Sequence, residues 1–95
     1  MSTREKREWA IDKVREEFHR AVTMHDPFHT AHEGYAVILE ELDELKAEIW
    51  KRKSLRDNDQ MIKEAIQVAA MALRFIVDVC WKDLNAKRAG KRGQI

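Results

Sequence analysis

The sequence is poor in residues that interrupt a chain or cross-link it. Its 95 residues include three glycines, one proline and one cysteine. Because Cys80 has no second cysteine to pair with, an intramolecular disulfide is excluded. The scarcity of glycine and proline, together with many Ala, Leu, Ile, Glu, Lys and Arg residues, favours helix almost throughout. The sequence therefore predicts one all-α domain.

Long apolar runs are also missing. The most apolar stretch, Ala65–Trp81, is interrupted by Gln67, Arg74 and Asp78, so it does not read as a membrane span. The first eight residues lack the apolar centre of a signal peptide. We therefore expect a soluble, cytoplasmic protein that makes no membrane contact.

A broad excess of positive charge is the third absence. The net charge is +1, but residues 1–86 carry 14 basic and 17 acidic side chains, a net of −3. The balance comes from four basic side chains near the C-terminus: Lys87, Arg88, Lys91 and Arg92. This distribution argues against nucleic-acid binding. We assign residues 1–86 to the domain and residues 87–95 to a basic, flexible tail.

Three helices account for nearly all of the domain. Their predicted bounds are residues 3–23, residues 30 to 52 or 53, and residues 57–59 to 85, with loops at 24–30 and 54–59. Ser2 with Glu5, and Thr30 with Glu33, fit the capping-box spacing at the first two starts. The third start is capped by Asp57, Asn58 or Asp59.

The third helix is apolar on almost every side, which indicates a helix buried all round. Two other helices in so short a chain cannot easily enclose it. We therefore predict that the long second and third helices run antiparallel and form a four-helix-bundle-like core in a homo-oligomer, either a homodimer or a homotetramer.

The second helix carries an apolar seam with a polar stripe beside it. The predicted seam consists of Tyr35, Ile38, Leu42, Leu45 and Ile49. Gly34 lies on nearly the same face as Glu41 in the stripe. A glycine there has two interpretations, room for a ligand above the carboxylates or close packing between helices.

An acidic constellation interrupts these apolar patterns. Glu41 and Glu44 are three residues apart and therefore neighbours on one helix face, and Glu64 and Gln67 repeat that spacing on the third helix. Together they offer three carboxylates and an amide oxygen, hard ligands that suit Mg²⁺ or Mn²⁺. The alternative is an ion network in which Arg74 pairs with one of the carboxylates.

These residues resemble the motif of the MazG-like all-α nucleoside triphosphate pyrophosphohydrolases. The motif, EExxE followed by ExxD, stands here as Glu40-Glu41-x-x-Glu44, 19 intervening residues, and Glu64-x-x-Gln67. The resemblance covers approximately residues 30–80. Gln67 departs from it, because the family usually has Asp there, and the neutral amide oxygen replaces a charged one.

The resemblance implies Mg²⁺-dependent hydrolysis of a nucleoside triphosphate, deoxy and non-standard ones included, to a monophosphate and pyrophosphate. It makes Glu41, Glu44 and Glu64 metal ligands, and Gln67 either a weak fourth ligand or a residue that holds metal-bound water. Glu40 becomes the catalytic base or a supporting residue behind the ligands. Candidates for substrate contact are Lys63 and Arg74 for phosphates, and His32, Trp50, Phe28 or Phe18 for the base.

Two other interpretations stay open. The chain could be a non-catalytic helical interaction module, with its acidic residues in ion pairs. It could also bind nucleotides with hydrolysis weakened by Gln67. In addition, His25, His29 and His32 cluster in and after the first loop, where lining a substrate pocket is favoured over binding zinc, since no cysteine joins them.

Overall fold

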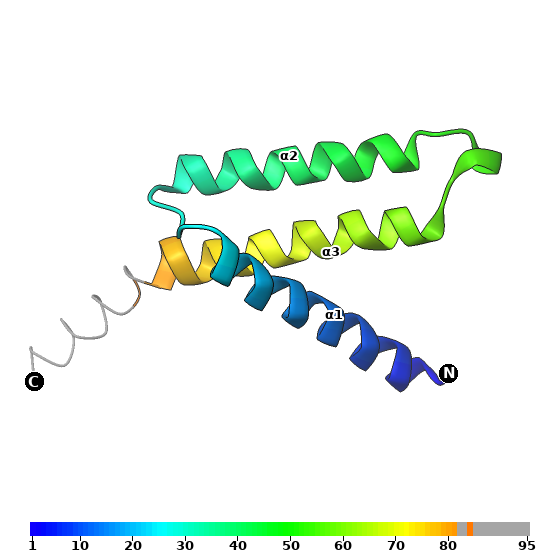
Figure 1. Cartoon of the computed structure of the whole chain (residues 1–95), viewed down its shortest axis with the longest axis horizontal. Helices are drawn as coiled ribbons and strands as arrows, with labels where there is room; N and C mark the ends of the chain where they lie inside the picture. Colours follow the sequence, from blue (N-terminus) through cyan, green and yellow to red (C-terminus); the bar gives the residue numbers. More distant parts are fainter. Residues whose placement is uncertain (82–83, 85–95) are drawn as a thin grey trace, which may run out of the picture.

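The structure is a computed structural model that describes residues 1–81 and 84, and every ordered element in this part of the chain is helical. The long helices are α1 (Thr3–Met24), α2 (Ala31–Ile49) and α3 (Asn58–Phe75) (Figure 1). A short 3₁₀ turn, η1 (Lys53–Leu55), precedes α3, and a π-helical turn, η2 (Ile76–Cys80), follows it. The all-α prediction and the three long helices are confirmed.

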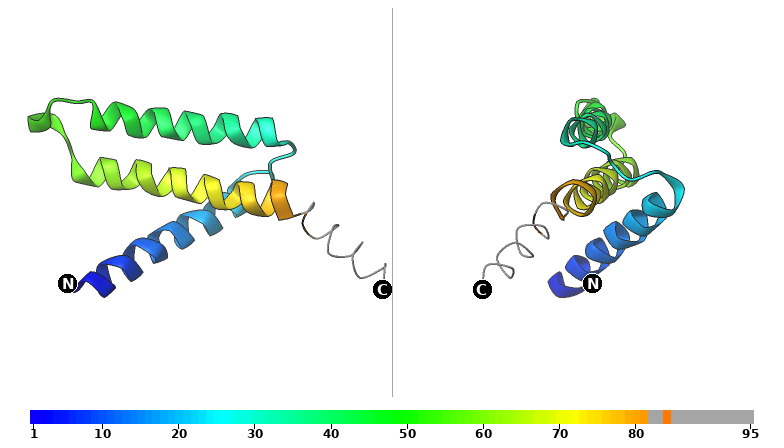
Figure 2. Two further views of the ribbon diagram at one scale, coloured as in Figure 1. Left: turned by 180° about the vertical axis from the view of Figure 1, so that it is seen from behind. Right: turned by 90° about the vertical axis from the view of Figure 1, so that its left-hand side faces the viewer.

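The third helix is the centre of the arrangement. It packs against both α1 and α2. Figure 1 shows α2 and α3 side by side and antiparallel, as predicted, with α1 crossing α3 obliquely. The end-on view in Figure 2 places α1 and α2 on different sides of α3. Two flanks of α3 therefore stay uncovered between α1 and α2. One flank is polar and the other is apolar.

The starts of the helices follow the predicted caps. Ser2 and Glu5 form a complete capping box at α1, and the Asp57 side chain accepts from the amide of Asp59 at α3. Thr30 accepts from the amide of Glu33 at α2. The Glu33 carboxylate, however, accepts from the backbone amide of His29 at 3.1 Å. The box predicted at α2 is therefore only half formed there.

The end of α2 lies earlier than predicted, at Ile49 instead of Arg52 or Lys53. Arg56 donates from Nε to the Ile49 carbonyl at 2.8 Å. This bond satisfies one of the carbonyls that a helix end leaves without an intrahelical partner. The chain then makes the 3₁₀ turn η1, which overlaps the start of the predicted loop at 54–59.

The C-terminal part of the third helix changes its winding. At η2 the Trp81 amide donates to the Ile76 carbonyl, five residues back, where an α-helix would use a four-residue step. Such π turns shift all later side chains around the helix axis and are frequent at functional sites. The sequence predicted a continuous helix to Asn85. That end, and the predicted tail at 87–95, lie outside the described residues.

The buried core is small and lies where the three helices approach one another. Its buried apolar members are Ala21, Phe28, Ala70 and Met71, with Phe18, Val37, Ile38, Phe75 and Val79 packed around them. Gly34 is also buried, and a Cβ built on it would lie 2.6 Å from Cδ2 of Phe75. Gly34 therefore permits close packing between α2 and α3, the second of its two interpretations.

The predicted seam of α2 is partly wrong. Ile38 and Leu45 are half-buried, but Tyr35, Leu42 and Ile49 are exposed. The side of α2 that packs on the core instead carries Gly34, Val37 and Ile38. Glu41 also lies on this side of α2, so the contact face is rotated away from the predicted apolar stripe.

An apolar surface remains uncovered. A groove of about 700 Å³ runs between α1 and α3, lined mainly by Ala10, Ile11, Val14, Phe18, Ala69, Ala72 and Leu73. Ile76 and Val77 are half exposed. None of the helices among the described residues combines the length and hydropathy required to cross a membrane.

Candidate functional site

Three of the predicted metal ligands meet between α2 and α3. Each of Glu41, Glu44 and Glu64 offers one carboxylate oxygen, and these oxygens lie within 4.8 Å of one another. Glu41 and Glu44 come from adjacent turns of α2, and Glu64 comes from α3. No other such group of His, Cys, Asp or Glu side chains occurs in the described part of the chain. The motif spacing therefore predicted a real spatial cluster.

Desolvation and mutual repulsion dominate the electrostatics of this cluster. Desolvation, and then repulsion from Glu44, raises the pKa of Glu41 to about 7, with smaller effects from Glu64 and Glu40. Desolvation and the contact with Glu44 also raise the pKa of Glu64, which Lys63 partly opposes. Both shifts mean that the charged forms are disfavoured in the folded chain, so a bound cation would relieve them.

The donor set fits a hard divalent cation. Mg²⁺ binds oxygens at about 2.0–2.1 Å in octahedral geometry, which places neighbouring ligand oxygens about 3 Å apart. Carboxylates on long Glu side chains can close that difference by rotating. Mg²⁺ commonly keeps part of its coordination shell for water and substrate phosphates, so three protein carboxylates are a sufficient protein share.

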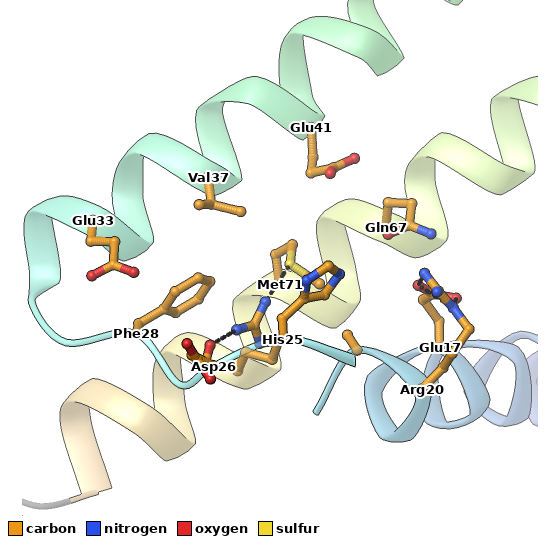
Figure 3. Close-up of a pocket in the computed structure, with 12 residues that line it drawn as sticks. Glu17, Arg20, His25, Asp26, Phe28, Glu33, Val37, Glu41, Gln67 and Met71 are labelled. Atoms are coloured by element: carbon orange, nitrogen blue, oxygen red, sulfur yellow. Dashed lines mark hydrogen bonds and ion pairs between the residues drawn. The ribbon is translucent and has the colours of Figure 1, made fainter. Parts of the chain in front are cut away.

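A cavity opens beside the cluster, on the polar flank between α1 and α2. Its volume is about 380 Å³, within the usual range for small-molecule pockets. Glu41 belongs to the wall of this cavity as well as to the carboxylate cluster. Val37 and Met71 supply apolar surface, and Arg20, His25 and Gln67 supply polar groups (Figure 3). A ligand in the cavity would therefore adjoin a cation held by the three carboxylates.

Gln67 faces α1 as well as the cavity. It lines both the cavity and a second hollow between α1 and α3, and Glu17 and Arg20 line the same two spaces. Arg20 donates from Nε to both carboxylate oxygens of Glu17, at 3.1 and 2.9 Å. Hydrogen bonding from Arg20, with a smaller contribution from Gln67, holds the pKa of Glu17 below its usual range. Glu17 is therefore a charged group on this wall.

Arg74 links α3 to the segment that joins α1 to α2. It is only 4% exposed. It donates from Nη2 to the Asp26 carbonyl at 2.7 Å, and its guanidinium lies 4.2 Å from the centre of the Phe28 ring. Nε lies 4.0 Å from Oδ2 of Asp78, which accepts from the Phe28 amide at 3.0 Å.

These contacts exclude the predicted ion pair between Arg74 and a glutamate of the cluster. Its acidic partner is Asp78, and none of the three clustered glutamates pairs with it. Arg74 lines the cavity, but its guanidinium is already occupied by Asp26, Phe28 and Asp78. The structure therefore gives Arg74 a role in fixing the connecting segment, and its contact with a phosphate stays a prediction.

The other predicted polar residues lie around the cluster. Glu40 is exposed on α2 and lines a shallow hollow with Leu39 and Asp43, outside the cavity. The same hollow is also lined by Glu44 of the cluster, and the charge of Glu40 contributes to the raised pKa of Glu41. Lys63 lies between α1 and α3, where its charge acts on Glu64. Neither side chain lines the cavity.

The residues predicted to stack on a base are not gathered at the cavity. Phe28 lines it, but the ring is buried against Arg74. Phe18 lines the apolar groove, and Trp50 stands exposed at the end of α2 beside Lys46. His32 is exposed and belongs to none of the five described hollows.

Five polar residues of the cavity wall were missed as site residues: Glu17, Arg20, His25, Asp26 and Glu33. Glu17 and Arg20 appeared as part of a solvated face of the first helix, and His25 only as one of three clustered histidines. His25 does line the cavity, whereas His29 pairs with Glu33 at 3.3 Å. The signal for Glu17 and Arg20 was their three-residue spacing, which also occurs in exposed ion pairs of the same helix such as Asp12 with Arg15.

Comparisons with protein-family models, with curated proteins and with solved structures gave no match to this chain.

Proposed function

We propose that the protein hydrolyses a nucleoside triphosphate to a nucleoside monophosphate and pyrophosphate with the help of Mg²⁺, for which Mn²⁺ can substitute. The observation that carries this proposal is the meeting of Glu41, Glu44 and Glu64 within 4.8 Å beside a cavity that shares Glu41. The motif resemblance supports the choice of a triphosphate over other metal-binding substrates.

The roles follow from this arrangement. Glu41, Glu44 and Glu64 would hold the cation, and Gln67, one turn beyond Glu64 on α3, would add a neutral oxygen. A bound divalent cation would supply charge neutralisation for phosphate oxygens. Lys63 stays a candidate for phosphate contact, because its charge already acts on the cluster. Glu40 stays a candidate base or supporting residue for Glu41.

The direct experiment is a screen of ribo- and deoxynucleoside triphosphates with Mg²⁺, read by pyrophosphate release. Glu44→Gln is the matched variant, because Glu44 is exposed and its replacement should leave the fold intact. We expect pyrophosphate from at least one nucleotide with the parent protein and a loss of at least about a hundredfold with the variant. Release of inorganic phosphate alone, or equal activity of the variant, would reject the proposal.

The apolar groove supports a second element of the proposal, assembly into a homodimer or homotetramer. Among the described residues the buried apolar side chains are only four, too few for an independently stable domain of this length. The same surface is what the non-catalytic alternative requires, a helical interaction module. Metal binding separates the two, because the interaction module needs none.

A further inference from the structure

The cavity beside the carboxylate cluster has a wall in which acidic residues outnumber basic ones. Its acidic lining residues are Glu17, Asp26, Glu33 and Glu41. Both of its arginines already donate to partners within the fold, Arg20 to the Glu17 carboxylate and Arg74 to the Asp26 carbonyl. A triphosphate carries several negative charges, and such a wall would repel them. The cavity therefore suits the uncharged nucleoside part of the proposed substrate, with the phosphates left at the cation.

His25 brings to this wall a hydrogen-bond donor that no partner occupies. It lines the cavity, and Figure 3 shows its ring directed into the group of lining side chains. Within the part of the chain that the structure describes, the ring makes no hydrogen bond. An imidazole has at least one N–H to donate in either protonation state, whereas ionised carboxylates only accept. The His25 ring is therefore available to donate to a ligand in the cavity.

The backbone that carries His25 is fixed on both sides of the residue. Its own amide donates to the Ala21 carbonyl at 3.0 Å, at the end of α1. The carbonyl of the next residue, Asp26, accepts from Nη2 of Arg74 at 2.7 Å. Arg74 is itself buried, and its guanidinium lies over the Phe28 ring. Because this backbone is already ordered, the His25 side chain has less conformational freedom to lose when a ligand binds.

We propose that His25 is a substrate-contacting residue that donates from its ring to an acceptor on the nucleoside part of the nucleotide, and that Arg74 is the positioning residue that presents it. This inference rests on the proposed function, which names the nucleotide as substrate. It adds to the site a contact from the segment between α1 and α2, whereas the three carboxylates come from α2 and α3.

The test compares a probe that carries the nucleoside with one that lacks it. The first is the set of α,β-imido analogues of the common deoxynucleoside triphosphates, which resist cleavage between the α and β phosphates, and the second is inorganic tripolyphosphate. Both are titrated with Mg²⁺ present and followed by calorimetry. His25→Phe keeps a ring but no donor, so it should weaken the tightest-binding analogue about fivefold to tenfold. Tripolyphosphate affinity should not change.

The matched control is His19→Phe, the same substitution at an exposed residue of α1 that lines the apolar groove on the other flank. It should leave the affinity for both probes unchanged. Equal losses for the two probes in His25→Phe would place His25 at the phosphates or the cation and overturn the inference. An unchanged affinity for every analogue would overturn it as well.

The positioning role of Arg74 is tested by a double-mutant cycle. Arg74→Lys keeps a cation but loses the planar fork, so it should weaken the tightest-binding analogue about threefold. In the His25→Phe background the same change should have no further effect, because the donor that Arg74 presents is gone. Asp78→Asn removes the charge that Nε of Arg74 faces at 4.0 Å, and it repeats the cycle where Arg74→Lys does not fold. Equal factors in both backgrounds, or weaker binding of tripolyphosphate, would reject the positioning role.

A metal-free readout separates this inference from the proposed function. Titration of the parent with the common 2′-deoxynucleosides should shift the nuclear magnetic resonance signals of the His25 ring, assigned by their loss in His25→Phe, for at least one nucleoside. Such shifts in a protein that releases no pyrophosphate would confirm the His25 contact and reject the proposed hydrolysis. Unmoved His25 signals in a protein that hydrolyses triphosphates would reject the contact and leave the hydrolysis standing.

Discussion

At the scale of single residues, the fold strongly disfavours the ionised form of Glu41. Its pKa is raised to about 7 by desolvation and by the neighbouring carboxylates, from an ordinary value of 4.5. The folded protein therefore binds more protons than the unfolded chain between these two pH values. Since stability falls with rising pH wherever the folded state holds the extra proton, the metal-free protein should lose stability from about pH 5 to pH 7 through this group.

Glu41→Gln should remove that dependence. We expect the melting temperature of the variant to exceed that of the parent at pH 8 without metal and to approach it at pH 5, where Glu41 is protonated. Thermal melts at the two pH values measure this, with Glu16→Gln as an exposed control on α1. A Glu41→Gln variant that is less stable than the parent at pH 8 would show that the ionised carboxylate has a partner within the fold.

Divalent metal should reverse the same trend in the parent. A cation bound only by the folded state stabilises it by mass action, about 2.7 kcal/mol at a hundred times the dissociation constant. Protons compete for the same carboxylates, so the stabilisation by Mn²⁺ should grow from pH 5 to pH 8 and vanish in Glu64→Gln. Melts with and without Mn²⁺ decide this, and equal melting temperatures in the parent at pH 8 would favour the interaction-module alternative.

The sequence could predict the glutamates of the cluster but not the place of Glu17 in the cavity wall. A three-residue spacing on one helix already places Glu41 beside Glu44, and Glu64 attracted attention because it interrupts an apolar helix. Glu17 sits in a helix where acidic and basic residues alternate. Which of them turns inward depends on the angle at which α1 crosses α3, and local spacing contains no information about that angle.

At the scale of the elements, Gly34 sets how closely α2 approaches α3. A Cβ there would lie 2.6 Å from Cδ2 of Phe75 and 3.2 Å from Cδ2 of Phe28, and both belong to rings in or against the core. Gly34→Ala should therefore destabilise by about 1–3 kcal/mol through overpacking, despite a gain of about 1 kcal/mol in helix propensity. Urea unfolding measures the change, with exposed Ala36→Gly as the propensity control. A more stable Gly34→Ala would show that the helices can separate freely.

The connecting segment between α1 and α2 depends on Arg74 and on the π turn. Arg74→Met leaves the Asp78 carboxylate without its cation and the Asp26 carbonyl without its donor. Breaking one side of a buried ion pair costs about 3–5 kcal/mol, and the half-buried Asp78 places the expected loss near the lower end. Urea unfolding should show it, together with faster hydrogen exchange at the Phe28 amide. Arg15→Met, at an exposed pair, should cost less than about 1 kcal/mol.

Helix starts were predictable from the sequence, and helix contacts much less so. Ser2, Thr30 and Asp57 act through neighbours two or three residues away, so their signals are local. The π turn at Ile76–Cys80 has no comparable local signal. Asp78 lies in this turn and accepts from the Phe28 amide, a contact across 50 residues of sequence. The predicted α2 seam was offset for a similar reason, because the tertiary arrangement turns Glu41 inward at the expense of Leu42.

At the scale of the whole molecule, the described part of the chain has more exposed large apolar side chains than buried ones. The apolar groove between α1 and α3 has room for side chains of another helix. Ile76 and Val77, which follow Leu73 along the chain, are half exposed as well. The polar cavity with Glu17 and Gln67 lies on the other flank. An assembly through the apolar groove would therefore leave the proposed site open to substrate.

This geometry yields a prediction about assembly with a matched pair of variants. Leu73 lines the groove and is 37% exposed, whereas Leu39 is 40% exposed but lies on the outer side of α2, beside Glu40 and Asp43. If a second copy covers the groove, Leu73→Lys places a charge in an apolar interface and should shift the protein from dimer to monomer. Leu39→Lys should leave the dimer unchanged, since its surroundings are already solvated and acidic.

Sedimentation at micromolar concentration distinguishes the two species. A stable interface buries about 1,200–2,000 Å² in total. At about 25 cal/mol per Å² of apolar area, this burial contributes more free energy of stabilisation than the four buried side chains of one copy can provide. Leu73→Lys should therefore also lower the melting temperature. The melting temperature of the parent should rise with protein concentration, because its folding and association are coupled. A parent protein that sediments as a well-folded monomer would reject this assembly. Equal behaviour of the two lysine variants would instead place the interface elsewhere on the molecule.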